Sequence, residues 1–131
     1  SRYGLLKSMA NSKNGILMGT SSFWEGIDLS GDMLEILIIT KLPFQVPSDP
    51  IVKAYSDKLA DHDMNPFLNF TVPECILKYR QGFGRLIRTS LDQGIFIVLD
   101  NRIVTKRYGQ HFQDAIPVEM QMFSTLDSLI L

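Results

Sequence analysis

Short apolar runs constrain the fold of this chain most, because they lack regular alternation with polar residues. They cover residues 16–18, 34–40 and 95–99, and the two longer runs are rich in β-branched side chains. A strand that is apolar on both faces is typical of a parallel sheet covered by helices. Helical patterns separate the runs, so the sequence predicts an α/β layer fold.

Helices are predicted between and around these strands. Ser48 or Asp49 is expected to cap a helix with Pro50 in its first turn, and Thr71 with Glu74 forms a capping-box pattern. The predicted helices cover residues 1–11, a segment beginning at Pro50 with Ile51, Tyr55 and Leu59 on one face, residues 71–89 and residues 108–115. The tail from Val118 is expected to form an edge strand and a short helix.

Composition narrows the class of protein. A chain of 131 residues with 45% hydrophobic residues fits one domain. Cys75 is the single cysteine, which excludes a disulfide within the chain and agrees with a reducing, cytoplasmic location. The two histidines, His62 and His111, lie far apart, so no metal site is expected. No run is long enough to cross a membrane, and a start at Ser1 without methionine suggests a fragment.

Charge is unevenly distributed although the net charge is only -1. Acidic residues dominate residues 49–74, and basic residues dominate residues 78–107. A basic segment in a neutral chain can mark an anion site, and it can equally be a solvated face.

The segment 71–89 predicts a helix with two unlike faces. At about 100° per residue, its apolar side chains gather on one side, and they are Val72, Ile76, Tyr79, Phe83, Leu86 and Ile87. Gln81, Arg85 and Arg88 share a stripe on the other side. On that stripe Lys78 is expected to pair with Glu74.

Two glycines, Gly82 and Gly84, each cost about 1 kcal/mol inside a helix relative to alanine, which suggests that something approaches the backbone. Two arginines beside a glycine suit a phosphate. The alternative is that Arg85 and Arg88 are simply solvated.

The stretch GTSSFWEGIDLSGD, residues 19–32, follows the first apolar run. Its hydroxyls (Thr20, Ser21 and Ser22) can bind a phosphate of a nucleotide or nucleic acid. Its aromatic pair (Phe23 and Trp24) can stack on a base or belong to the core. Glu25 and Asp28 are acceptors separated by a turn at Gly26. Because ligands of open α/β sheets sit beyond the carboxyl ends of the strands, this stretch is expected at that edge.

These segments together resemble a known family. The stretch at residues 19–32 resembles helicase motif V, and QGFGRLIR resembles motif VI, of the XPD/DinG-type superfamily 2 DNA helicases, with the bacterial DinG branch the most similar. ITKLPFQVPSDP, LDNR and YGQHFQDAIP extend the resemblance over about residues 15–117 of a 1–131 domain, leaving 118–131 as a tail.

The resemblance implies a RecA-like second motor domain that shares an ATP site with a first RecA-like domain. It implies that Arg88 is an arginine finger, that Arg85 is its neighbour at the γ-phosphate, and that Gln81 and Gly84 lie at the nucleotide. Glu25, Gly26 and Asp28 would couple nucleotide to DNA. Thr20 and Ser21 would lie near single-stranded DNA, with weaker claims for Ser22, Phe23 and Trp24.

The sequence contains neither a GxxxxGK[ST] phosphate loop nor a DEAH-like box. The chain alone is therefore expected to be inactive, with ATP and Mg²⁺ held mainly by the other domain. The family's motif IV strand is also missing, which predicts a gap in the sheet, filled by an upstream segment or by self-association. Three alternatives remain: a DinG-like exonuclease with its nuclease upstream, a degenerate nucleic-acid-binding module, and a domain whose arginines dock on an acidic partner.

Overall fold

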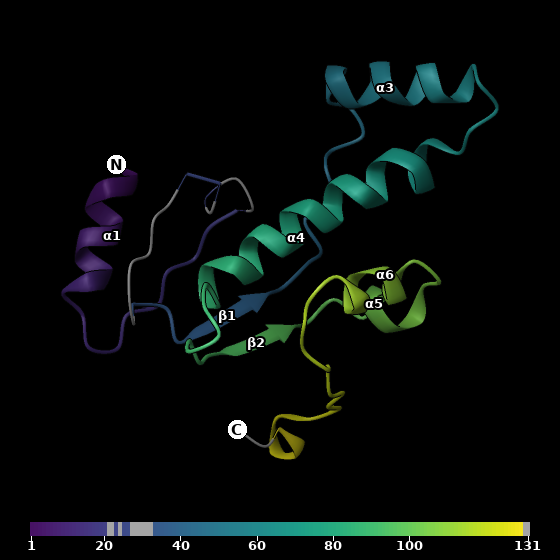
Figure 1. The fold of residues 1–131 in the computed structure, drawn as a ribbon. Helices are drawn as coiled ribbons and strands as arrows, with labels where there is room; N and C mark the ends of the chain where they lie inside the picture. Colours follow the sequence, from purple (N-terminus) through teal and green to yellow (C-terminus); the bar gives the residue numbers. More distant parts are fainter. Residues whose placement is uncertain (21–22, 24, 27–32, 130–131) are drawn as a thin grey trace.

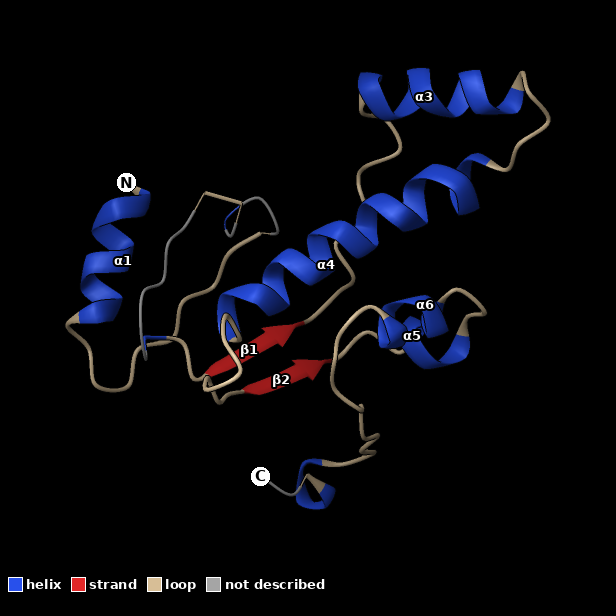
Figure 2. Ribbon diagram, viewed as in Figure 1, coloured by secondary structure: helices blue, strands red, loops and turns tan. Residues whose placement is uncertain are grey.

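The computed structural model describes residues 1–20, 23, 25–26 and 33–129. Its elements follow one another along the chain as α1, β1, α3, η2, α4, β2, α5, α6 and η3 (Figure 1). Helices accompany a small parallel sheet, against which α4 packs, and this confirms the predicted α/β class (Figure 2).

The sheet consists of β1 (Ile36–Ile39) and β2 (Ile95–Val98), paired in parallel with Ile36 opposite Ile95 and Ile39 opposite Val98. Both strands lie inside the runs that the sequence predicted. The predicted strand at residues 16–18 is wrong: this segment has no strand structure, and Ile16 and Met18 are 91% and 89% exposed. A strand needs a hydrogen-bonding neighbour, and within the described ranges this segment has no ladder partner.

The helix α4 (Val72–Leu86) crosses over the sheet from β1 to β2 (Figure 2). Its buried side chains include Tyr79 and Phe83, and both rings contact Phe96 of β2. The predicted apolar face is confirmed: it lies in the core together with Cys75, Ile39 and Leu42, while Ile76 and Ile87 pack at its margin. Burial of this face is the main stabilising contribution of the helix.

The predicted start of this helix after Thr71 is confirmed, whereas the predicted capping box and the predicted C-terminal end are wrong. The π-helix η2 (Phe67–Thr71) leads directly into α4, so the Val72 N–H already donates to the Phe67 carbonyl and Thr71 makes no side-chain cap. At the other end, Ile87 has extended backbone angles and terminates the helix. Arg88 therefore lies beyond α4 rather than on it.

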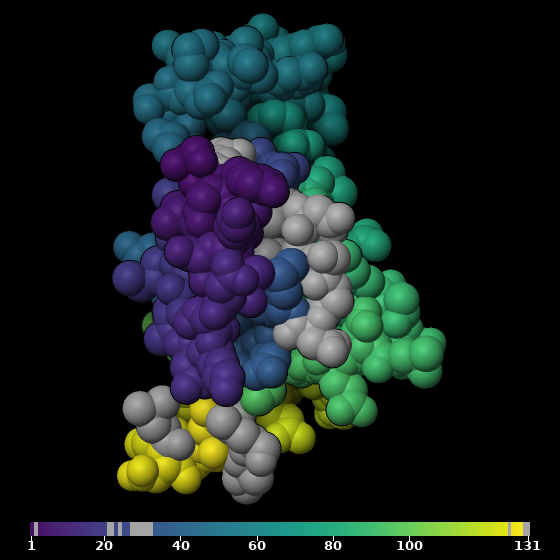
Figure 3. Space-filling view, turned by 90° about the vertical axis from the view of Figure 1, so that its left-hand side faces the viewer, coloured from purple at the N-terminus to yellow at the C-terminus, as the bar shows by residue number. Residues whose placement is uncertain are grey.

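The helices α1 (Arg2–Ala10) and α3 (Pro50–Ala60) agree with their sequence predictions. Ser1 caps α1, and the Asp49 carboxylate caps α3 by accepting from the N–H groups of Ile51 and Val52. Val52 is the buried residue of α3, whereas Ile51 and Tyr55 are mostly exposed. Figure 3 shows α3 projecting at one end of the molecule and the C-terminal tail at the other.

The C-terminal part packs two short helices, α5 (Arg102–Thr105) and α6 (Gly109–Asp114), against each other. The helix predicted at residues 108–115 is confirmed as α6, whose Phe112 is fully buried. The predicted edge strand is wrong, because residues 118–125 form no strand. The tail instead anchors through Met120, whose Sδ accepts a hydrogen bond from the Tyr79 hydroxyl at 3.7 Å, and ends in η3 (Leu126–Ser128). None of the helices in the described part has the length and apolarity needed to cross a membrane.

Candidate nucleotide and nucleic-acid site

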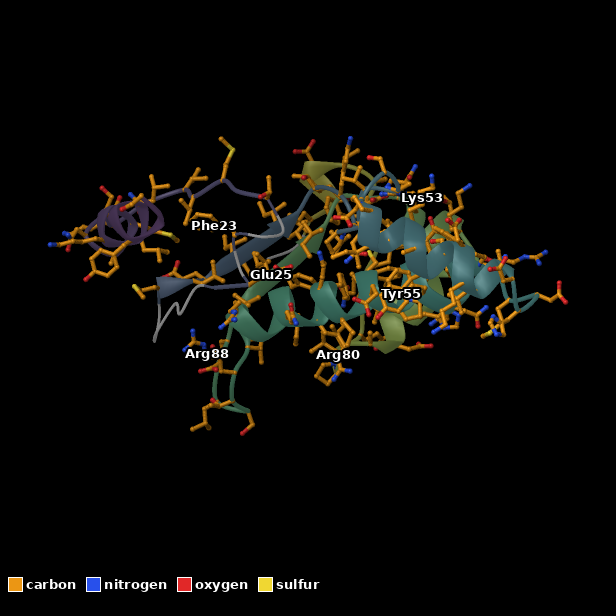
Figure 4. The ribbon with its side chains drawn as sticks, turned by 90° about the horizontal axis from the view of Figure 1, so that it is seen from above. Phe23, Glu25, Lys53, Tyr55, Arg80 and Arg88 are labelled. Carbon is orange, nitrogen blue, oxygen red and sulfur yellow. The ribbon has the colours of Figure 1, made fainter. Side chains whose placement is uncertain are left out.

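An ion pair connects the stretch at residues 19–26 to α4. The Lys78 Nζ lies 3.4 Å from the Glu25 Oε1. Figure 4 shows Glu25 above α4 and Arg88 near the end of that helix. The predicted pairing of Lys78 with Glu74 is wrong, because no ion pair between these two is formed and Lys78 turns to the loop instead. Two sequence segments predicted to carry the site are thus in direct contact.

The described part of this loop is a tight turn. The Phe23 N–H donates to the Thr20 carbonyl at 2.8 Å. A Cβ added at Gly19 would lie 3.0 Å from the Phe23 ring, so the glycine permits the ring to pack against the backbone. Phe23 is half-buried, whereas Thr20, Glu25 and Gly26 are exposed. Ser21, Ser22, Trp24 and Asp28 lie outside the described residues.

Lys78, Gln81 and Arg85 lie along one side of α4. Seven residues separate Lys78 from Arg85, which places them within about 20° of each other around the helix and about 10 Å apart along it. Gln81 is exposed and Arg85 is half-buried. The predicted three-residue stripe is wrong for Arg88, since the helix ends before it.

Arg88 is positioned by its backbone instead. The Asp92 Oδ2 accepts from the N–H groups of Thr89 at 2.7 Å and Arg88 at 2.8 Å. These hydrogen bonds hold the pKa of Asp92 below its usual value, so the carboxylate is ionised at neutral pH. The turn fixes the backbone of Arg88 while its side chain is exposed.

The two helix glycines have different surroundings. Gly82 is buried, whereas a Cβ added at Gly84 would meet no atom of the described residues within 4 Å. Packing against the described residues therefore does not require glycine at position 84. The open space leaves the backbone accessible beside Arg85, which fits an approaching anionic phosphate.

The arginines do not lie at the carboxyl edge of the sheet, where the stretch 19–32 was expected. A Cβ added at Gly94 would contact Leu86 and the Glu35 carbonyl, so the end of α4 lies beside residues that precede β2 and β1. A helix that connects parallel strands must run back across the sheet. Its C-terminal arginine end therefore lies at the amino edge.

The carboxyl edge holds a polar pair that the sequence interpretation did not single out. Asp100, 8% exposed, accepts from the Leu42 N–H at 2.8 Å and from the Arg102 Nη2 at 2.6 Å. The hydrogen bonds from the Arg102 guanidinium, with those from backbone N–H groups, lower the pKa of Asp100 to about 2. Arg102 also lies 5.0 Å from the centre of the Phe44 ring. The sequence signal that could have identified this pair is an acidic residue, Asp100, directly after the apolar run 95–99.

Comparison with protein families identifies a related family. A model described as a helicase C-terminal domain matches residues 1–119. This covers both the loop with Glu25 and the helix with Arg85.

Curated relatives carry helicase and exonuclease names. The chain is 43% identical over 113 residues to a protein of Bacillus subtilis named 3'-5' exonuclease DinG. It is 41% identical over 113 residues to the ATP-dependent DNA helicase YoaA of Escherichia coli, and 46% identical over 116 residues to the ATP-dependent DNA helicase DinG of Photobacterium profundum. In each comparison 86% of the chain is covered, against 12%, 18% and 17% of the relative. The chain thus spans a small part of these proteins.

Proposed function

This chain belongs to the family of helicase C-terminal domains, with DinG and YoaA helicases among its relatives, and on that premise we propose that it is the C-terminal motor half of an ATP-dependent DNA helicase. It adopts a RecA-like fold and completes an ATP site held by a first RecA-like domain. The contact between Glu25 and Lys78 carries this proposal, because it joins the loop resembling motif V to the helix resembling motif VI.

Arg85 and Arg88 supply positive charge to the triphosphate. Phosphoryl transfer depends mainly on positioning and on stabilising charge, and an arginine supplied from another domain contributes roughly 10³ to 10⁵ in rate. The half-buried Arg85 and the turn that holds the Arg88 backbone support this role. Gln81 and Gly84 lie beside the nucleotide, and Mg²⁺ is held mainly by the first domain.

The loop binds single-stranded DNA and couples DNA binding to the ATP site. Thr20, Ser21 and Ser22 contact the DNA backbone, Phe23 and Trp24 lie near the bases, and Glu25, Gly26 and Asp28 couple DNA to nucleotide. The exposure of Thr20 and Gly26 supports an accessible loop. The helicase acts in the cytoplasm.

A further strand completes the sheet beside β1. Among the described residues, one edge of β1 has no strand beside it and residues 16–18 are exposed and unpaired, and both observations support this idea. An upstream segment of the same polypeptide provides that strand, which allows residues 16–18 to join the sheet on its far side.

A second candidate function is suggested by the name of the Bacillus subtilis relative. The longer protein that contains this domain then degrades DNA with a nuclease domain elsewhere, and this chain serves as its ATP-dependent part. Nuclease activity that is lost together with an upstream domain, while ATP hydrolysis persists, distinguishes this candidate. A degenerate binding module would instead bind DNA without hydrolysing ATP.

The main test is Arg88→Ala in the full-length protein. We expect DNA-stimulated ATP hydrolysis to be abolished and ATP affinity to change by no more than a few-fold, because the finger acts in the transition state. Steady-state hydrolysis and binding of a fluorescent ATP analogue measure the two effects. Arg107→Ala, which removes another exposed arginine, is the matched control and should retain activity. Undiminished turnover in Arg88→Ala would reject the finger assignment.

A further inference from the structure

We propose that Lys78 is a positioning residue that couples the DNA-binding loop to the arginine end of α4 through its ion pair with Glu25. This inference rests on the proposed function, because it needs the loop to bind DNA and Arg85 to serve the triphosphate. It assigns Glu25 a partner within the chain, whereas the resemblance implies only that this carboxylate couples nucleotide to DNA.

The pair is placed where it can act on Arg85. Lys78 and Arg85 lie on nearly the same line along α4, separated by about two helical turns. A helix is stiff over this distance, so a displacement of the Lys78 end moves Arg85 with it. Arg80 lies about 160° around the helix from Lys78, and Figure 4 shows it on the side of α4 away from Glu25.

The strength of the pair suits coupling more than stability. The Lys78 and Glu25 side chains are 24% and 43% exposed to solvent. Ion pairs between side chains this exposed contribute little to folding. A contact of this strength can break and reform during each cycle, and it can still shift a balance between two states.

Lys78 has a second acidic residue within reach, Glu74, with which it does not pair. It lies one turn before Lys78 on α4, at the spacing that favours an ion pair within a helix. The lysine nevertheless contacts Glu25, which lies 53 residues earlier in the chain. A tertiary contact that replaces the local one ties two segments together.

The test measures coupling and not only activity. In full-length Lys78→Ala we expect the ratio of DNA-stimulated to basal ATP hydrolysis to fall about fivefold, the lower end of typical coupling between sites. Basal hydrolysis and single-strand affinity should stay within twofold of wild type. Lys78→Arg should preserve the ratio, since it keeps the charge. Arg80→Ala, which removes a charge from another side of the same helix, is the matched control.

A double-mutant cycle keeps the result decisive if one variant folds poorly. Glu25→Gln combined with Lys78→Ala should lower the ratio no further than Glu25→Gln alone, because both changes remove the same contact. If the double variant shows the product of the two single effects on the ratio, the inference is overturned. An equal loss of basal and DNA-stimulated hydrolysis overturns it as well. A normal ratio in Lys78→Ala beside an inactive Arg88→Ala overturns this inference alone. An active Arg88→Ala counts against the proposed function.

Discussion

A buried carboxylate destabilises a fold unless its oxygens are satisfied, and Asp100 satisfies both. Its Oδ1 accepts from the Arg102 N–H and Nε, and its Oδ2 accepts from the Leu42 N–H and the Arg102 Nη2. These bonds hold the segment after β1 to the segment after β2. Asp100 is therefore a structural residue at the carboxyl edge, distinct from the exposed Glu25 of the loop.

Asp100→Asn should destabilise the chain in a pH-dependent way. The folded pKa of Asp100, about 2, lies below the ordinary value of 3.8. The ionised carboxylate therefore contributes stability above pH 4, on the order of 2 kcal/mol, and this contribution disappears as pH falls from about 4 to about 2. Urea unfolding of both forms at several pH values measures it. A difference between the two that stays constant down to pH 2 would contradict this account.

The helix elements show how backbone hydrogen bonds decide where a helix begins. The residues Thr71 and Glu74 have the composition of a cap, but η2 already supplies acceptors for the first N–H groups of α4. A cap stabilises a helix only where those groups are unsatisfied. The residues of a capping box are therefore present, but the capping hydrogen bond from the Thr71 side chain does not form.

Gly109→Ala and Gly84→Ala should have opposite consequences. A Cβ at Gly109 would collide with the backbone carbonyls of Ile103 and Arg102 where α5 meets α6, whereas Gly84 faces open space. We expect Gly109→Ala to lose about 1–3 kcal/mol of unfolding free energy. Gly84→Ala should be neutral or stabilising by up to about 1 kcal/mol.

Thermal and urea unfolding of the two variants provide the comparison. Equal stability of Gly109→Ala and wild type would show that the two short helices can separate without cost. If Gly84→Ala also lowers ATP hydrolysis while stability is retained, the close approach of a ligand to this backbone is supported.

At the scale of the molecule, one face of the sheet is covered and the other is partly bare. Phe96 contacts α4, and alternation along paired strands puts Leu37 on the same face. Ile36 and Ile38 point the other way and are 45% and 51% exposed. Apolar side chains of a parallel sheet are normally buried on both faces.

The isolated chain should therefore self-associate. Sedimentation velocity over a range of concentrations should reveal oligomers, because the exposed isoleucine face, and an edge of β1 that pairs with no strand in the described part of the chain, are available for contact. Ile38→Lys should shift the distribution toward monomer, and Lys58→Ala on the distant helix α3 is the control. A strictly monomeric chain at every concentration would contradict this prediction.

The sequence by itself determined the class of fold and the identity of the segments. Continuous apolar runs located β1 and β2, and a capping residue at Ser48 or Asp49 before Pro50 located the start of α3. Helical periodicity gave the buried face of α4 with Tyr79 and Phe83. These features depend on local propensity and on the periodicity of burial, which are written in neighbouring residues.

Only the tertiary structure decided which segments meet. Lys78 has an acid at the right spacing on its own helix and pairs with Glu25 instead. Residues 16–18 have the composition of a strand but pair with no strand among the described residues, and Arg88 leaves the stripe because Ile87 ends the helix. Ion pairs, strand pairing and helix ends all depend on partners distant in sequence, so no local pattern fixes them.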